Sequence, residues 1–237
     1  MAQHIGIVGC SAPGAALCYQ TICTESAAVM GGDEPHPEVS MHTHPFSEYM
    51  RYIERDNWNG VANLMLSSAE KLARIGAQFL VAPCNTIHYA FEIVSARSPL
   101  PWLHIAEEVA LEARRLGCRR VGLMGTKFLI ESSVYPARFD QAGLECRLPA
   151  ERDRERADGL IFEEMVKGRF TPEARSFFLN MINDLQAQGC DAVGMCCTEL
   201  PILLEQEKTP LPLLNSTIIL ARAALKKAGA REKEDWN

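Results

Sequence analysis

The sequence predicts an α/β protein made of two similar halves, each with a mostly parallel sheet. Two observations predict this fold class. Short apolar runs rich in Val, Ile and Leu alternate with longer segments of helical period, which is typical of parallel strands with crossover helices on both faces of the sheet. A weak internal repeat also relates the first part of the chain to the second, and both copies end a predicted strand at a cysteine.

The predicted elements follow one another in order along the chain. A buried strand at residues 4–9 is followed by a loop at residues 10–14, and a helix at residues 58–75 is followed by a strand at residues 79–82. Further helices are predicted at residues 105–116, 155–167, 172–188 and 215–228, and further strands at residues 120–125 and 191–195.

The spacing of glycine and cysteine defines the internal repeat. In both copies a helix-ending glycine comes eight positions before a cysteine, Gly76 before Cys84 and Gly189 before Cys197. The strands that open the two halves are also similar in sequence. The repeat therefore indicates two α/β halves of like build, each with a cysteine at the end of a strand.

This repeat divides the chain into two domains. Residues 1–104 together with residues 210–237 are assigned to the first half, and residues 105–209 to the second. The helix that begins near residue 105 is expected to carry the chain from the first half to the second.

Composition and charge exclude several classes of partner. The net charge of −6 is mild and spread along the chain, which disfavours nucleic acid and anionic membranes as partners. The N-terminal residues do not resemble a secretory signal, and no apolar run approaches the roughly 20 residues that span a bilayer. We expect a cytoplasmic protein with reduced thiols. Its nine cysteines include no Cys-x-x-Cys pair, so a metal site is not predicted.

Cys84 and Cys197 are the candidate catalytic residues. Both fall where a predicted parallel strand ends and a helix begins, which is where α/β proteins bind ligands. The helix N-terminus can hold a carboxylate and can lower the pKa of a nearby thiol towards neutrality. Inverting a carbon requires one group to remove a proton from one face and a second group to deliver a proton to the other. Two equivalent thiols satisfy that requirement without a cofactor, and at rest they form a coupled pair of one thiolate and one thiol.

Four segments carry a resemblance to a known family. Two of them contain the candidate thiols, Cys84-Asn-Thr-Ile-His and Cys197-Thr-Glu-Leu-Pro, and these are the specific part. The other two are Gly125-Thr-Lys-Phe and Phe162-Glu-Glu-Met-Val-Lys-Gly. Together they resemble the motifs of the aspartate/glutamate racemases that need no pyridoxal phosphate, and the resemblance covers nearly the whole chain.

The resemblance implies two similar α/β domains related by a pseudo-twofold, with the active site in the cleft between them, in a homodimer. The implied ligand is a small amino-acid substrate, aspartate or glutamate. Cys84 would act on the α-proton of the D-enantiomer and Cys197 on that of the L-enantiomer. By the same resemblance, Lys167 is an anionic anchor and four residues hold the α-carboxylate: Asn85, Thr86, Thr126 and Thr198.

Two segments depart from the family pattern and leave the substrate open. The first loop is Gly9-Cys10-Ser11-Ala12-Pro13, where the family carries Gly-Gly-Met followed by a small residue and Pro or Glu. Ser11 is the substrate-binding candidate in this loop. Around residues 39–48, where family members select the side chain, the chain has His42 and His44. These histidines could recognise a carboxylate, and His42 is the candidate.

Two side chains near the thiols allow two interpretations each. His88, one helical turn beyond Cys84, could tune the thiol or pack, and packing is favoured. Glu199 could assist proton transfer at Cys197 or simply favour a helix N-terminus, and the second is favoured. Cys196 is not predicted to be the catalytic thiol, because the eight-residue spacing and the Thr-Glu that follows both select Cys197. Neighbouring residues on a strand also point to opposite faces, so only one of the two can face the cleft.

Other functions remain open on the same pattern. One is a cysteine-dependent isomerase or decarboxylase of a small dicarboxylic acid, which needs only one thiol. Another is a non-catalytic protein that binds a small anion, which would leave the paired thiols without a purpose. Two cysteines in matched positions favour the racemase.

Overall fold

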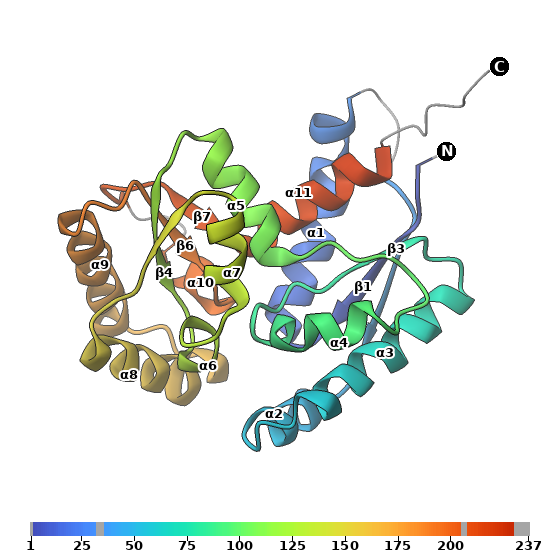
Figure 1. The fold of residues 1–237 in the computed structure, drawn as a ribbon, viewed down its shortest axis with the longest axis horizontal. Coiled ribbons are helices and arrows are strands. Elements are labelled where there is room, and N and C mark those ends of the chain that lie inside the picture. The colour runs from blue at the N-terminus through green and yellow to red at the C-terminus, as the bar shows by residue number, and fades with distance from the viewer. Residues whose placement is uncertain (1, 32–35, 205–207, 230–237) are drawn as a thin grey trace. The chain divides into compact units, whose positions relative to one another are not determined.

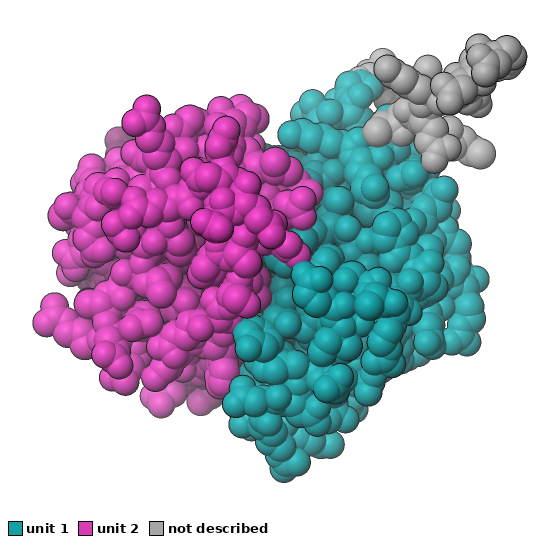
Figure 2. Space-filling model, in the orientation of Figure 1, with its two compact units in different colours: residues 1–105, 217–237 teal, residues 106–216 magenta. Residues whose placement is uncertain are grey.

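The computed structural model describes residues 2–31, 36–204 and 208–229. The chain forms two compact units, shown in separate colours in Figure 2. The first unit contains residues 1–105 and 217–237, and the second contains residues 106–216. Among the described residues, no helix is both long enough and apolar enough to cross a membrane.

The first unit has a three-stranded parallel sheet in the order β2-β1-β3. Its strands are β1 (Ile5–Gly9), β2 (Val39–Thr43) and β3 (Phe79–Val81). β1 and β3 are buried along their whole length, as expected for strands covered on both faces. β2 lies at one edge, and a single parallel bridge from Leu80 to Trp102 extends the other edge.

Helices cover both faces of this sheet (Figure 1). α1 (Ala12–Met30) and α11 (Ser216–Gly229) share a buried cluster with Ile5, Ile7, Phe79 and Val81. α3 (Trp58–Arg74) covers the opposite face, where Gly6 leaves room for Leu72 and Leu80. The remaining helices of the unit are α2 (Phe46–Ile53), η1 (Thr86–Ala90) and α4 (Phe91–Ser95).

The second unit has a four-stranded parallel sheet in the order β5-β4-β6-β7. Its strands are β4 (Arg120–Met124), β5 (Glu145–Arg147), β6 (Ala192–Met195) and β7 (Leu213–Asn215). Its helices are α5 (Ile105–Arg115), α6 (Lys127–Ile130), α7 (Val134–Gln141), α8 (Glu151–Gly159), η2 (Leu160–Glu164), η3 (Met165–Lys167), α9 (Pro172–Ala187) and α10 (Glu199–Leu204). α9 buries Phe178, Ile182 and Leu185 in one cluster with Met124 and Val193.

The two sheets confirm the predicted α/β class with parallel strands, and they repeat the same topology. In each unit the first strand is central, the second pairs on one side and the third pairs on the other. Gly76 and Gly189 end the helices before β3 and β6 with φ of 96° and 81°, which favours glycine. Gly76 and Gly189 therefore hold matching places before the third strand of each unit.

Several element boundaries differ from the sequence prediction. The predicted loop at residues 10–14 is mostly the first turn of α1, since Pro13 suits that position. The predicted helix at residues 155–167 begins earlier, at Glu151, and continues as the π-helix η2 and the 3-10 helix η3. Asn215 belongs to β7 and not to the last helix. β2, β5 and β7 were not predicted, because they have three to five residues and are only partly buried.

Candidate active site

Cys84 follows the end of β3 in the first unit. Parallel strands end at the same edge of a sheet, so Ser11, just after β1, and His42, near the end of β2, lie at this edge too. β1 ends at Gly9, where a side chain would overlap the methyl group of Thr43. The first sheet therefore brings Ser11, His42 and Cys84 to one edge, as expected for a ligand site in an α/β unit.

Two of the predicted carboxylate-binding residues follow Cys84 directly. Asn85 is buried and already helical, with φ −63° and ψ −43°, and Thr86 begins η1. A capping residue normally has extended backbone angles, whereas those of Asn85 are helical. The side chain of Asn85 makes no capping hydrogen bond and therefore does not cap η1.

His88 braces the segment that leads to Cys84. Its buried ring donates from Nε2 to the carbonyl oxygen of Ala82 over 3.0 Å. The ring also stacks on Phe91 and meets His104 edge-on, with centroids 5.6 and 4.8 Å apart. These contacts give His88 a structural role beside the thiol.

We expect His88→Leu to lower the free energy of unfolding by about 1–3 kcal/mol, because the buried carbonyl of Ala82 would lose its donor. Urea unfolding of the variant and the parent measures the change. Tyr89→Phe, at the exposed neighbouring residue, is the control and should stay within about 0.5 kcal/mol of the parent. Equal stability of the two variants would show that this brace contributes nothing.

Tyr49 on α2 is a buried polar group that the sequence did not single out. Its side chain is fully buried, and among the described residues its hydroxyl has no partner that meets hydrogen-bond geometry. Burial raises the pKa of Tyr49 far above its usual range, and the nearby thiols of Cys10 and Cys84 raise it further, while the Ser68 hydroxyl acts in the opposite direction. The Tyr49 hydroxyl therefore stays protonated at neutral pH, and Cys10, Cys84 and Ser68 are among the groups that act on its pKa.

His42 makes a hydrogen bond with Lys71, a residue that the sequence analysis did not identify as a candidate. Lys71 on α3 donates from Nζ to His42 Nε2 over 2.9 Å, so the ring proton lies on Nδ1 and points to Ser68 Oγ, also at 2.9 Å. Partial burial, Lys71 and His44 all lower the pKa of His42, which keeps its ring neutral near pH 7. The cation at this end of β2 is therefore Lys71, which His42 positions.

Cys197 lies two residues beyond β6 in the second unit, in contact with a carboxylate. Its thiol donates from Sγ to Glu199 Oε2 over 2.9 Å, and the Thr198 hydroxyl donates to the same oxygen over 2.8 Å. All three residues are at most 8% exposed, so water screens this contact little. Glu199 is also the first residue of α10, so both roles considered for it from the sequence fit its position.

Cys196 belongs to a separate buried group behind the strand end. It is 2% exposed, and its thiol shares a hydrogen bond with Tyr135, which also bonds to Ser216. Ser216 in turn donates to the carbonyl oxygen of Met195 over 3.0 Å. Burial raises the pKa of Cys196 well above its usual range, so this thiol stays protonated. Both cysteines lie beyond β6, so the argument from strand alternation does not apply, and their different contacts distinguish them instead.

The other two predicted site residues of the second unit differ in exposure. Thr126 is buried at the end of β4 and precedes α6, without a capping side-chain hydrogen bond. The backbone N–H of Lys127 beside it donates to Asp158 over 2.8 Å. Lys167 is exposed at the end of η3, before Gly168 with φ 77°. Of these two residues, Thr126 is therefore buried and Lys167 is open to solvent.

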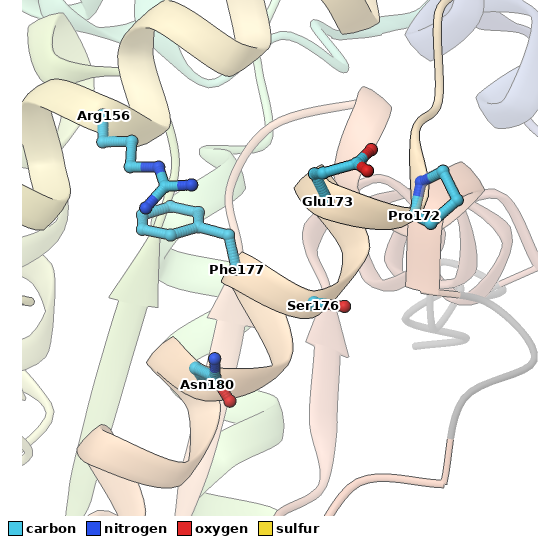
Figure 3. Close-up of a pocket in the computed structure, with 6 residues that line it drawn as sticks. All are labelled: Arg156, Pro172, Glu173, Ser176, Phe177 and Asn180. Carbon is cyan, nitrogen blue, oxygen red and sulfur yellow. The ribbon is translucent and has the colours of Figure 1, made fainter.

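A surface pocket of about 350 Å³ lies on α8 and α9 and contains neither thiol (Figure 3). Its lining residues are Arg156, Pro172, Glu173, Ser176, Phe177 and Asn180. The Arg156 guanidinium lies 4.7 Å from the Phe177 ring centroid and makes a cation–π contact with it. None of these side chains is buried, so the pocket has the character of ordinary surface. Within the described residues, no three His, Cys, Asp or Glu side chains gather as a metal site would require.

Comparisons with known proteins match this chain to amino-acid racemases. A family model described as Asp/Glu/Hydantoin racemase matches residues 6–224. The broad specificity amino-acid racemase RacX of Bacillus subtilis (strain 168) is 23% identical over 195 residues, which is 81% of this chain and 82% of that protein. A glutamate racemase of Aquifex aeolicus (strain VF5) is 28% identical over 54% of this chain and 48% of its own length.

Two solved structures are similar along nearly their whole length. A Yersinia pestis protein assigned to the Asp/Glu racemases superposes with a TM-score of 0.86 at 28% identity, covering 95% of this chain and 99% of its own. An aspartate racemase homologue from Pyrococcus horikoshii OT3 gives a TM-score of 0.81 at 26% identity, covering 97% and 100%.

Proposed function

The chain belongs to the Asp/Glu/Hydantoin racemase family, and we propose that it is an amino-acid racemase that interconverts the enantiomers of aspartate or glutamate with two cysteines and no cofactor. The observation that carries the proposal is the repeated topology, with Cys84 after the third strand of one unit and Cys197 after the third strand of the other. Matched strand ends supply matched acid/base groups, as a reversible inversion requires.

In the proposed mechanism, one thiolate removes the α-proton and the other thiol protonates the opposite face. Cys84 serves the D-enantiomer and Cys197 the L-enantiomer, so both must reach the same α-carbon. When the C–H bond breaks, its electron pair moves into the α-carboxylate, which must be held by hydrogen-bond donors. Four residues are assigned to it: Asn85, Thr86, Thr126 and Thr198. Ser11 lies at the same sheet edge as Cys84 and joins them.

Two lysine side chains support the proposal that the substrate has an acidic side chain. Lys71, positioned by His42, lies at the edge of the first sheet where β2 ends, and Lys167 is exposed on the second unit. The relatives differ in their named substrates, since one is a broad specificity racemase and another a glutamate racemase. The proposal therefore rests its substrate class on these lysines.

The test is exchange of the α-proton in heavy water with a panel of L- and D-amino acids. We expect aspartate or glutamate to lose the α-proton signal from both enantiomers and to lose optical activity, in the presence of a metal chelator and after hydroxylamine treatment. Proton NMR and polarimetry follow the two processes. Turnover of neutral amino acids alone would refute the acidic substrate, and loss of activity with chelator would refute the cofactor-independent mechanism.

Two further properties belong to the proposal. All nine cysteines lie within the described residues, and there none forms a disulfide, which fits a reducing compartment such as the cytoplasm. We propose a homodimer by family resemblance, which sedimentation equilibrium would test. The alternative of a one-thiol isomerase or decarboxylase predicts that one of the two cysteines is dispensable, and an anion-binding protein predicts that both are.

A further inference from the structure

Asp158, near the end of α8, is a carboxylate that the proposed mechanism does not use. Its Oδ1 accepts a hydrogen bond of 2.8 Å from the backbone N–H of Lys127, which lies 31 residues away in the sequence. Lys127 is the first residue of α6, so its N–H has no acceptor within that helix. Partial burial raises the pKa of Asp158, while the Lys127 N–H and ammonium group act in the opposite direction. Burying this carboxylate therefore has a cost, which its contact with the start of α6 partly offsets.

The start of α6 belongs to a turn that packs against the segment of the second thiol. β4 and β6 are neighbours in the sheet, so the residues that follow both strands lie at the same edge. Just beyond β6, the backbone N–H of Cys196 donates to the carbonyl oxygen of Met124 over 2.8 Å. A Cβ at Gly125 would lie 3.3 Å from the Cys196 carbonyl oxygen and 3.4 Å from the Cys196 Cβ. Thr126 and Cys197 come next in these two segments, so a shift of the turn would move Thr126 relative to the thiol.

α8 and the following η2 contact this turn and α6 through several side chains. Three contacts accompany that of Asp158: Arg154 with Glu131 at 3.3 Å, Glu155 with Lys127 Nζ at 3.8 Å, and the Phe162 ring edge-on to that of Phe128 with centroids 6.3 Å apart. These three join side chain to side chain, whereas Asp158 binds the backbone of the turn itself. Of the four contacts, that of Asp158 is therefore the one that can fix the backbone next to Thr126.

We propose that Asp158 is a positioning residue of the racemase: by accepting the Lys127 N–H, it fixes the turn that presents Thr126 to the α-carboxylate of the substrate. The inference rests on the proposed function, in which Thr126 is one of the donors to that carboxylate. When the α-proton leaves, its electron pair enters the carboxylate, and donors already in place stabilise this charge without reorganising. Asp158 acts through the turn and not on the substrate, so its effect should disappear when Thr126 can no longer donate.

The first test is hydrogen exchange of the backbone amides, followed residue by residue by NMR. A hydrogen-bonded amide exchanges slowly, so the Lys127 N–H should be protected in the wild-type protein. Asp158→Ala should speed its exchange by about tenfold or more, and Asp158→Asn, which keeps an oxygen acceptor, should not. Glu155→Gln is the matched control and should leave the exchange unchanged, since Glu155 pairs with the side chain of the same lysine. An unprotected Lys127 N–H in the wild-type protein would overturn the proposal without any variant.

The second test is the rate of racemisation. Asp158→Ala should lower kcat/KM by about tenfold to a hundredfold, the scale of a misplaced binding group, and Asp158→Asn should rescue most of this loss. In the Thr126→Val background, Asp158→Ala should cause no further loss, because the donor that it positions is already absent. A merely structural role would lower kcat/KM by the same factor in both backgrounds, and that result would overturn the proposal.

Amide exchange needs no turnover, so the two proposals fail in different ways. If Asp158→Ala frees the Lys127 N–H but the wild-type protein racemises no amino acid, the proposed function fails and the positioning role fails with it, while the contact stands. If the wild-type protein racemises an amino acid and Asp158→Ala does so equally well, the proposed function stands and the positioning role is wrong.

Discussion

Cys84→Ser and Cys197→Ser are each expected to lose racemisation by about a thousandfold or more. A positioned acid/base group contributes about 10²–10⁴-fold, and serine, whose pKa is far higher than that of a thiol, cannot serve as the base. Circular dichroism or polarimetry of the amino acid measures the rate. Because inversion needs both partners, the two losses should be similar, and the double variant should be little worse than either one.

Exchange without inversion should survive in each single variant and should differ between enantiomers. Cys197→Ser keeps Cys84, so it should exchange the α-proton of the D-substrate with solvent deuterium faster than that of the L-substrate. Cys84→Ser should show the reverse preference. Proton NMR in heavy water reads both rates directly.

Cys196→Ser is the matched control for the second thiol. Its side chain contacts Tyr135 in a buried group apart from Glu199, so the variant should stay active. An inactive Cys196→Ser together with an active Cys197→Ser would mean that the repeat is misaligned by one residue. Normal racemisation by both Cys84→Ser and Cys197→Ser would remove the two-thiol mechanism itself.

The paired thiols could be predicted from sequence because their signal is local and repeated. Each copy combines a left-handed glycine, an apolar strand and a cysteine at fixed spacing, and burial on both faces makes such strands continuously apolar. The edge strand β5, in contrast, reads Glu-Cys-Arg over three residues and is only partly buried. β5 is a strand because its backbone pairs with β4, and no pattern of side chains in the sequence predicts that pairing.

The groups that surround the thiols could be predicted less well, because they depend on tertiary placement. Lys71 and His42 are 29 residues apart and meet only because α3 packs against β2. Tyr49 lies in no recognisable sequence motif. Only the structure shows that it is buried and that Cys84 is among the groups that raise its pKa. Glu199 was visible in the sequence, but its bond to Cys197 depends on the backbone turn between β6 and α10.

Gly122→Val is expected to lower the free energy of unfolding by about 3 kcal/mol. A Cβ at this position on β4 would lie 2.7 Å from Leu185 Cδ1 and 3.0 Å from its Cδ2. Leu185 is fully buried in the cluster of α9 and cannot move away without displacing its neighbours, so overpacking costs at the upper end of its usual range. Urea unfolding followed by circular dichroism measures the loss.

Two further variants show whether this contact is the cause. Gly159→Ala, at a helical glycine with nothing within 4 Å of its would-be Cβ, should instead stabilise the protein by about 0.5–1 kcal/mol. Leu185→Ala alone should cost about 2–5 kcal/mol by leaving a cavity. Combined with Gly122→Val it should cost clearly less than the sum, because the valine methyl groups fill part of the space that Leu185 vacates. Strict additivity of the two changes would mean that the close approach of α9 to β4 at Gly122 is not what makes glycine necessary there.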